Sequence, residues 1–382
     1  MSKKLIKSFD DHNNFNNVIV PLSLDIDEVI FIFHHEVSQN KIDNCRKVIE
    51  KYKQIKLSFL KVNKEDAKTI INDDVLVDVS ANKYISLILH DFALKNNLEI
   101  IYYDEIDRVI KEYKSHSTYV SKMFKLSIED MLNLNGGRIT SSLHTPISNK
   151  ETIKLLYKTI EGTSGEYSRF ISFVSKINSL ITNLDRNKNV FYINEDIKKK
   201  IVSDDNYLRF KEYDLFLLED GKLIFFDEEI AKLFRVSGTF LENYLYHKLV
   251  ESDKFDDVSM SVTIEFNNEQ WKYPVRCEID LLVLKDNSLL FTSVKSNKVE
   301  AADLNEIKVH NLMFGNIYSK PVICINSNLS KNSPSIYAKG EELNIAIIDE
   351  DSFKNDDVVA QFLSVIDNTY KYDKIGRTYE EK

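Results

Sequence analysis

The chain has 382 residues, a length at which two or three domains are expected. It is 43% hydrophobic with only 9 Gly and 5 Pro, which favours packed globular domains and excludes a largely disordered chain. Its net charge of −9 excludes nucleic-acid binding through overall positive charge. A nucleic-acid partner would need a local basic surface, or a metal ion that offsets the carboxylates.

The three cysteines, Cys45, Cys277 and Cys324, stand in separate segments without C-x-x-C or Cys/His spacing. This indicates reduced thiols rather than disulfides or a zinc site. The N-terminal segment lacks the apolar core of a signal peptide, and no run reaches the roughly 18 apolar residues of a membrane span. We therefore expect a cytoplasmic protein with no membrane partner.

Residues 1–150 read as alternating strands and helices. The apolar run Glu28–Phe33 is typical of a buried parallel strand, and a helix follows over about 41–53. Further strands are expected at 55–62, 75–79 and 98–103, with a helix at 84–94. This order predicts an open, mostly parallel sheet covered by helices.

Ligands bind such sheets at the carboxyl ends of the strands. Two loops are expected there, His34-His35-Glu36 and Ser80-Ala81-Asn82-Lys83. Helix-start amides, a hydroxyl and a lysine would suit a phosphate. Ser80 as a plain N-cap, and His34 and His35 as ordinary loop residues, are interpretations that remain open. No GxGxxG or Walker loop occurs, so neither a dinucleotide site nor an NTPase site is supported.

Residues 151–231 are interpreted as a connecting subdomain without visible chemistry. A helix at Leu126–Asn135, ended by Gly136-Gly137, precedes it. Within it we expect helices at Glu151–Ile160 and Arg169–Leu184. A β-hairpin is expected from Tyr207–Leu218 and Lys222–Phe226, with its turn around Asp220-Gly221.

Residues 232–370 predict a second α/β unit, followed by a charged, mobile tail over 371–382. Leu241, Tyr244, Leu245 and Leu249 lie on one face of an amphipathic helix. After this helix we expect strands at 258–266, 271–284 and 288–295. A helix at 302–314 and two further strands at 321–325 and 343–348 follow. This order predicts a compact unit with a mixed sheet.

The hairpin Arg276–Lys295 in this unit carries charged residues along one face. Asp286-Asn287 suits a two-residue turn, because both residue types tolerate positive φ. With that turn, Asp280 lies opposite Ser293, and Lys295 shares the face of Ser293. A carboxylate, a hydroxyl and an amine on one face form a candidate active site.

Metal-dependent phosphodiester hydrolysis requires carboxylates around a divalent ion and a nearby cation. A matching set occurs in the order Glu242 … Glu278-Ile279-Asp280 … Ser293-Val294-Lys295. This order resembles the PD-(D/E)xK nuclease core, in which such residues converge on Mg²⁺ or Mn²⁺. The resemblance implies Asp280 and Glu242 as metal ligands, with Glu278 or Ser293 completing the shell. It implies that Lys295 orients water or stabilises the pentavalent phosphate.

The wider pattern resembles the CARF-nuclease effectors of type III CRISPR systems. Their nuclease half is matched by S-G-T-F-L-E-N-Y-L-Y-H-K-L, C-E-I-D-L-L-V-L-K-D-N-S-L-L-F-T-S-V-K and D-L-N-E-I-K-V-H-N-L-M-F-G. The sensor's strand, loop and helix are matched by V-D-V-S-A-N-K-Y-I-S-L-I-L-H-D-F-A. The resemblance implies an α/β fold with a Rossmann-like CARF domain before a PD-(D/E)xK nuclease domain.

The same resemblance implies a function. The family members are homodimers whose sensor binds a cyclic oligoadenylate, typically cyclic tetra-adenylate, across a two-fold axis. Binding opens the nuclease to DNA or RNA in antiviral defence. Ser293 departs from the (E/D)-x-K acid and is a poorer metal ligand. Ala81 and Asn82 also depart from the family's T-G-G-T-K loop.

Simpler interpretations stand beside each assignment. Glu242 follows Thr239 in a T-x-x-E capping-box pattern, and Glu278 fits a solvated strand position. Asp280 is more informative, because aspartate is disfavoured and costly to bury in a strand of Ile, Leu and Val. Lys295 also fits an ordinary strand end.

Glu306 and His310 lie one helical turn apart on the following helix, from which they could approach the site, although a solvated face is the simpler interpretation for both. With Ser293 in place of an acid, the alternative function is a degenerate nuclease fold. Such a protein would bind cyclic nucleotide and nucleic acid, or a partner, without cleavage. A sensor that acts through transcription is disfavoured by the net charge.

Overall fold

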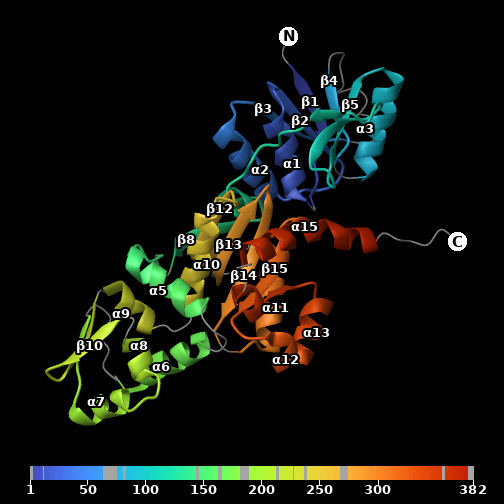
Figure 1. Cartoon of the computed structure of the whole chain (residues 1–382). Helices are drawn as coiled ribbons and strands as arrows, with labels where there is room; N and C mark the ends of the chain where they lie inside the picture. The colour runs from blue at the N-terminus through green and yellow to red at the C-terminus, as the bar shows by residue number, and fades with distance from the viewer. Residues whose placement is uncertain are drawn as a thin grey trace.

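The structure, a computed structural model, describes residues 3–11, 13–62, 75–80, 83–142, 146–161, 166–180, 189–211, 215–226, 228–235, 239–266, 274–296, 298–354 and 358–376. Three sheets organise the described chain into three units. Figure 1 shows the N-terminal unit at one end, a mixed sheet in the middle and a small subdomain at the other end. None of the described helices has the length and apolar character needed to span a bilayer.

The N-terminal unit is built on a seven-stranded sheet in the order β3-β2-β1-β4-β5-β6-β7. Its first five strands pair in parallel and the last two antiparallel, as the sequence predicts for a mostly parallel sheet. The strands are β1 Lys4–Ser8, β2 Glu28–Phe33, β3 Lys56–Lys61, β4 Val75–Asp78, β5 Glu99–Asp104, β6 Val109–Glu112 and β7 Thr118–Val120. The helices are α1 Asn14–Ser23, α2 Gln39–Tyr52, α3 Lys83–Lys95 and α4 Ile128–Leu134.

The central strand β1 is absent from the sequence-based expectations, because two of its five residues are lysines. Lys7 is fully buried, and its Nζ lies 2.7 Å from Asp78 Oδ2 on the neighbouring strand β4. It also donates to the carbonyl of Asn16 on α1, at 2.5 Å. Lys7, which makes β1 difficult to predict from the sequence, is thus a buried charge that is paired in the centre of the sheet.

The C-terminal unit is built on a six-stranded mixed sheet in the order β16-β15-β14-β13-β12-β8, which confirms the predicted mixed sheet. Its antiparallel part is β8 Gly137–Ser142, β12 Asp257–Phe266, β13 Val275–Lys285 and β14 Ser288–Lys295, and its parallel part adds β15 Lys320–Ile325 and β16 Ala346–Ile348. Strand β8, which lies within the segment expected to be the sensor, pairs here with β12.

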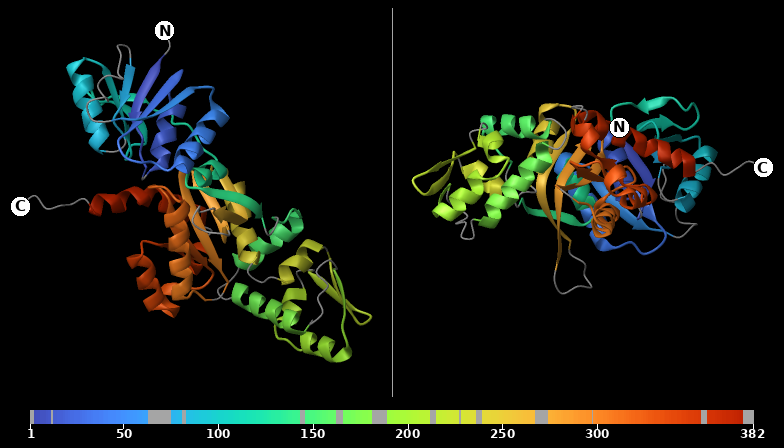
Figure 2. Two further views of the ribbon diagram at one scale, coloured as in Figure 1. Left: turned by 180° about the vertical axis from the view of Figure 1, so that it is seen from behind. Right: turned by 60° about the horizontal axis from the view of Figure 1, so that its bottom comes forward.

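Helices of the C-terminal unit are α10 Thr239–Glu251, α11 Ala301–Phe314, α12 Leu329–Asn332, α13 Pro334–Glu342, α14 Glu350–Lys354 and α15 Val358–Gly376. The sequence analysis does not include α12 and α13, although the parallel strands β15 and β16 require such a crossover. Helix α15 lies at the junction of the two units and runs through the start of the expected tail to Gly376 (Figures 1 and 2). Residues 377–382 lie outside the described residues.

The connecting subdomain comprises α5 Lys150–Ile160, α6 Glu166–Leu180, β9 Val190–Tyr192, α7 Glu195–Val202, α8 Tyr207–Lys211, β10 Phe216–Glu219, β11 Lys222–Phe225 and α9 Glu228–Arg235. The expected turn at Asp220-Gly221 is confirmed, with φ of 46° and 70°. The expected strand start at Tyr207 is wrong, because residues 207–211 form α8. The turn before α8 is fixed by Asp204, whose carboxylate accepts from the Asn206 amide at 2.9 Å.

The N-terminal unit and the mixed-sheet unit share one hydrophobic core. Phe15 on α1 packs edge-on against Tyr318, which precedes β15, with ring centroids 5.6 Å apart. Both residues belong to a continuous buried cluster that also contains Val29 on β2 and Phe291 on β14. Shared burial of this kind ties the two units together and limits their independent motion.

Removing one partner of the buried pair tests its importance. We expect Asp78→Ala to lower the free energy of unfolding by about 3–5 kcal/mol, because Lys7 keeps a buried charge without its carboxylate. Denaturant unfolding followed by circular dichroism measures the change. A double change, Lys7→Met with Asp78→Leu, should recover most of the loss. A single variant as stable as the wild type would contradict this account.

Candidate active site

The strands β13 and β14 separate where the candidate site begins. Their pairing runs from Lys285–Ser288 to Leu281–Thr292, as the predicted two-residue turn requires. Asp286 and Asn287 in that turn have φ of 47° and 61°. Beyond the last pair, the backbone amide of Val294 donates to a side chain instead of to a backbone carbonyl of β13. Its acceptor is Asp280 Oδ2, at 2.6 Å.

Ser293 lies beside the same carboxylate. Its hydroxyl donates to Asp280 Oδ2 at 3.3 Å, so the expected placement of Asp280 opposite Ser293 is observed. The contact makes Ser293 a neighbour that orients the carboxylate. Two donors on one oxygen fix the carboxylate's direction, and Oδ1 has no partner among these contacts.

Glu242 reaches this site from helix α10. It is 9% exposed, and its Oε2 accepts from the Ser261 hydroxyl on β12 at 3.2 Å. Thr239 is the first residue assigned to α10, and the Glu242 carboxylate points across to the sheet. A capping-box role alone does not account for that contact.

Glu242 and Asp280 repel each other in a buried setting. Burial raises the pKa of Glu242 to about 8 from its ordinary value of 4.5, and the charge of Asp280 adds to the rise. Burial also raises the pKa of Asp280, although the Val294 amide and the charge of Lys295 oppose this. A cation between the two carboxylates would stabilise their charged forms and so oppose both shifts.

The donor set fits a hard divalent ion held by few protein ligands. Mg²⁺ is commonly bound by one or two carboxylates, with water and substrate phosphate completing its shell. Among the described residues no group of three or more His, Cys, Asp or Glu is arranged to hold a metal ion. Asp280 and Glu242 are the two carboxylates that could hold such an ion, and the exposed Glu278 lies at the rim of the cavity.

A cavity of about 140 Å³ lies between this hairpin and helix α11. Its lining consists of four acids, one lysine, one histidine and four uncharged residues, namely Glu278, Asp280, Asp303, Glu306, Lys295, His310, Ile279, Thr292, Ser293 and Ile307. The acidic lining favours cations, whereas Lys295 offers one positive charge to a phosphate.

Helix α11 contributes more than a solvated face. The expectation is wrong for His310, which is 8% exposed and lines the cavity. Burial lowers the pKa of His310, although the charge of Glu306 opposes this, so its imidazole is neutral at pH 7. Glu306 is exposed as expected, yet it lines the same cavity.

Lys295 has a partner that the sequence analysis does not include. Its Nζ lies 2.8 Å from Asp303 Oδ1 in the first turn of α11. Burial lowers the pKa of Lys295, but the hydrogen bond with Asp303 outweighs this and leaves the pKa above its ordinary value. The E-x-x-D spacing from Glu300 to Asp303 is the sequence signal for this position.

The connecting subdomain also reaches the site. Tyr167 on α6 is 3% exposed, and its hydroxyl lies next to Ser296, directly after Lys295. Burial raises the pKa of Tyr167, and the charge of Glu242 adds to this effect. The subdomain expected to lack visible chemistry therefore forms part of the wall behind Glu242.

In the N-terminal unit the two predicted loops meet at the carboxyl ends of the strands. Helix α3 begins at Lys83, after the second loop, and its Tyr84 ring lies 4.9 Å from that of His34. His35 Nε2 is hydrogen-bonded to Asp11 Oδ2 at 2.8 Å. Ala81 and Asn82 lie outside the described residues.

Ser80 makes its described contacts within the fold. Its hydroxyl accepts from the Tyr103 amide at 2.7 Å and donates to Asp78, whose carboxylate also accepts from the Ser80 amide at 2.9 Å. Through Asp78 the loop is connected to the buried Lys7. These hydrogen bonds anchor Ser80 to the sheet.

Comparison with known proteins places the candidate site in a family context. Residues 227–314, which include Glu242, Asp280, Ser293, Lys295 and Asp303, match the model of the family described as Card1-like, endonuclease domain. Residues 227–314 are thus similar in sequence to the Card1-like endonuclease domain. No curated protein matches its sequence.

Two solved structures share the fold over nearly the whole chain. Protein VC1899 from Vibrio cholerae aligns with a TM-score of 0.77 at 16% identity, covering 95% of this chain and 98% of that one. Can2 from Sulfobacillus thermosulfidooxidans, solved in complex with cyclic tetra-adenylate, aligns with a TM-score of 0.71 at 14% identity. That alignment covers 95% of this chain and 97% of Can2. The expected CARF-plus-nuclease fold is thereby confirmed.

The raised pKa of Glu242 gives the metal-free protein a specific pH dependence. Folding adds a proton to Glu242 between its ordinary pKa of 4.5 and the folded value of about 8. Stability is therefore lost as pH rises through this window, by up to about 1.4 kcal/mol per unit. We expect Glu242→Gln, which keeps the size but carries no charge, to raise the melting temperature increasingly from pH 5 to pH 8.

Thermal unfolding in EDTA across this pH range measures the difference between the two proteins. Addition of Mn²⁺ should then stabilise the wild type more than the variant. A difference in melting temperature that stays constant with pH would contradict the buried carboxylate pair.

Proposed function

We propose that the protein is a homodimeric, metal-dependent endonuclease that is activated by a cyclic oligoadenylate and cleaves DNA or RNA in antiviral defence. The observation that carries the proposal is the convergence of Glu242, Asp280 and Lys295 within a Card1-like endonuclease domain. These residues come from a helix and two strands, and a cation bound between the buried Glu242 and the partly buried Asp280 would balance their negative charges.

The residues of the site would divide the chemistry among them. A bound divalent ion would polarise the phosphodiester and lower the pKa of an attacking water. Asp280 and Glu242 would hold it, with Glu278 at the rim. Ser293 would orient Asp280 through the hydroxyl contact at 3.3 Å. Lys295 would place its positive charge against the phosphate as negative charge develops there.

The N-terminal unit supplies support for a cyclic oligoadenylate activator, with cyclic tetra-adenylate as the first choice. The order of strands reverses direction between β1 and β4, and ligands of open α/β sheets bind at such a switch point. His34 and the Ser80 loop lie at this edge. Can2, whose fold the chain shares, was solved with cyclic tetra-adenylate.

An exposed apolar face on α3 supports the homodimer. Tyr84, Leu87 and Leu94 are 46%, 67% and 45% exposed, and their spacing puts them on one side of the helix. A contiguous apolar patch of this kind marks an interaction surface. Since α3 follows the Ser80 loop, a partner on this face would place two such loops around one two-fold axis.

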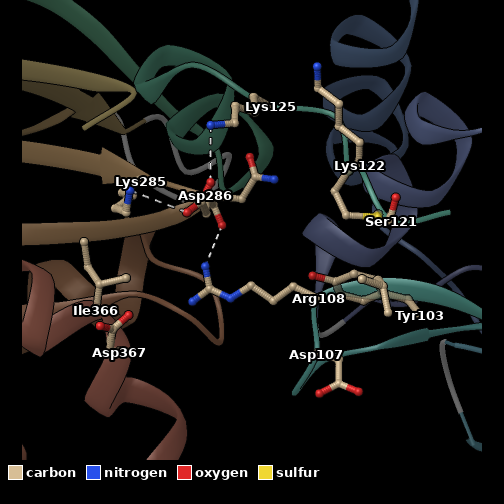
Figure 3. A pocket seen from close by; sticks show the side chains of 13 residues that line it. Tyr103, Asp107, Arg108, Ser121, Lys122, Lys125, Lys285, Asp286, Ile366 and Asp367 are labelled. Atoms are coloured by element: carbon tan, nitrogen blue, oxygen red, sulfur yellow. Dashed lines mark hydrogen bonds and ion pairs between the residues drawn. The ribbon is translucent and has the colours of Figure 1, made fainter. Parts of the chain in front are cut away.

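The sensor holds the closed end of the hairpin that carries the site at its open end. Arg108, in the turn between β5 and β6, donates through Nη1 to the Asp286 carbonyl and through Nη2 to the Ser288 hydroxyl, both at 2.7 Å. Its guanidinium lies 5.0 Å from the centre of the Tyr318 ring. Figure 3 shows Arg108 and Lys125 reaching Asp286 from the sensor side.

The Asn287 side chain adds to this clamp. It accepts from the Leu126 amide at 2.9 Å and donates to the Phe124 carbonyl at 2.8 Å. A cavity of about 410 Å³ adjoins these contacts and is lined from both units. We therefore propose Arg108 and its contacts as the route by which activator binding shifts β13 and β14.

Single changes in the site test the nuclease assignment. We expect Asp280→Ala or Lys295→Ala to abolish Mn²⁺-dependent cleavage of plasmid and single-stranded substrates in the presence of cyclic tetra-adenylate. Binding of cyclic tetra-adenylate, measured by calorimetry, should be unchanged because the sensor is intact.

Unchanged cleavage by either variant would contradict the assignment of that residue to the nuclease site. A wild-type protein that neither cleaves nor binds Mn²⁺ would instead favour the degenerate nuclease fold, which the Ser293 departure suggests.

Loss of the Arg108 contacts tests the proposed route. We expect Arg108→Ala to bind the activator as the wild type does, while stimulation of cleavage falls by about tenfold or more. Arg108→Lys should behave similarly, because a lysine cannot make the two-pronged contact. The matched control is Lys122→Ala, from the same cavity, whose side chain points away from Asp286 (Figure 3). Equal stimulation in Arg108→Ala and Lys122→Ala would exclude this route.

A further inference from the structure

Helix α11 fixes the position of the lysine in the candidate site. Lys295 Nζ is 2.8 Å from Asp303 Oδ1, whereas Asp280 interacts with the same ammonium only through its charge at longer range. Lys295 therefore rests against the α11 wall of the cavity. Asp280 lines the same cavity from β13.

Asp303 is itself held rigidly. Its second oxygen, Oδ2, accepts from the Glu300 amide at 2.7 Å, which caps the first turn of α11. Its side chain is 19% exposed, so part of the ion pair is removed from water. The next turns of α11 are anchored in the core by Leu304 and Ile307, which are 0% and 2% exposed. A carboxylate bound to a helix cap on a packed helix can set a lysine's position closely.

We propose that Asp303 is a positioning residue for Lys295, an inference that rests on the proposed nuclease function. The ammonium group has three donors, and Asp303 takes one. Two donors are then left for a phosphate and its attacking water. Asp303 also keeps Lys295 away from Asp280, so that the lysine does not compete with a cation for the buried carboxylates.

Two other roles for Asp303 give different results when the residue is changed. If Asp303 were a brake that withdraws Lys295 from the substrate, its removal would raise cleavage. If it were only a helix cap, an uncharged side chain with the same acceptor oxygen would replace it fully. Asparagine has such an oxygen and the same shape, so Asp303→Asn separates the charge from the cap.

The first experiment compares cleavage by the full chain at saturating cyclic tetra-adenylate and Mn²⁺. We expect Asp303→Asn to lower kcat by about 10- to 100-fold, because the lysine leaves its productive position, with a much smaller change in KM for the nucleic acid. The Mn²⁺ concentration needed for half-maximal rate should rise. Asp303→Glu, which restores the charge on a longer arm, should recover part of kcat.

The matched control is Glu300→Gln, which also removes one negative charge at the start of α11. Glu300 pairs with the exposed Lys298 at 2.8 Å and lies outside the cavity lining. Its kcat should stay within about twofold of the wild type. Equal losses in Glu300→Gln and Asp303→Asn would show a general charge effect and overturn the proposal.

A second readout is independent of cleavage. Reductive methylation followed by peptide mass spectrometry reports how freely each lysine ammonium reacts, and it needs neither metal nor activator. Lys295 should be modified several-fold faster, relative to Lys298, in Asp303→Asn than in the wild type. This labelling ratio tests the ion pair even if no activator produces cleavage. An absence of cleavage by the wild type would contradict the proposed function and not the ion pair.

The proposal is overturned by any of three results. These are Asp303→Asn cleavage equal to the wild type while Lys295→Ala is inactive, activator-free cleavage that rises in Asp303→Asn, or an unchanged Lys295 labelling ratio.

Discussion

Two carboxylates buried within range of each other are the constraint on which the candidate site depends. Glu242 and Asp280 come from a helix and a strand about forty residues apart in sequence. Burial raises the pKa of each, and the charge of Asp280 adds to the rise at Glu242. A fold keeps such an arrangement at a cost to its own stability. Functional sites are where that cost is commonly found, because a bound cation turns the repulsion into attraction.

The backbone arrangement around Asp280 explains how the sheet tolerates the site. The β13–β14 ladder ends one residue before Asp280, and the carboxylate then accepts the Val294 amide that the ladder would otherwise have paired. On its other edge β14 stays paired with β15 as far as Lys295. The hairpin is therefore held at its turn by the N-terminal unit and along its two edges by β12 and β15, and its strands separate only at the candidate site.

The sequence predicts those parts of the fold that depend on local patterns. The Asp286-Asn287 turn and the opposition of Asp280 and Ser293 follow from residue types that tolerate positive φ and from the two-residue period of strands. Strand β1 does not follow, because the partner that allows Lys7 to be buried is some seventy residues away. Tyr207–Lys211 has strand-like composition, yet the turn at Asp204 starts a helix there.

The candidate site divides in the same way. Asp280 and Lys295 can be selected from one hairpin, and Glu242 from its place on the preceding helix. Asp303 and the buried His310 cannot, because their importance depends on how α11 packs against β14. Ser80 shows the converse, since a residue chosen for a ligand is bonded to Asp78 and Tyr103 in the fold.

Strand β8 has a consequence for how separable the two halves of this protein are. Residues 137–142 follow the N-terminal unit, pair with β12 along the edge of the six-stranded sheet, and only then lead into the connecting subdomain. A fragment that begins after residue 145 would expose β12 as an unpaired edge, the kind of surface that recruits strands from other chains. The mixed-sheet unit is therefore not a detachable module, and recombination that exchanges N-terminal units between proteins of this fold would have to carry β8 with the C-terminal unit.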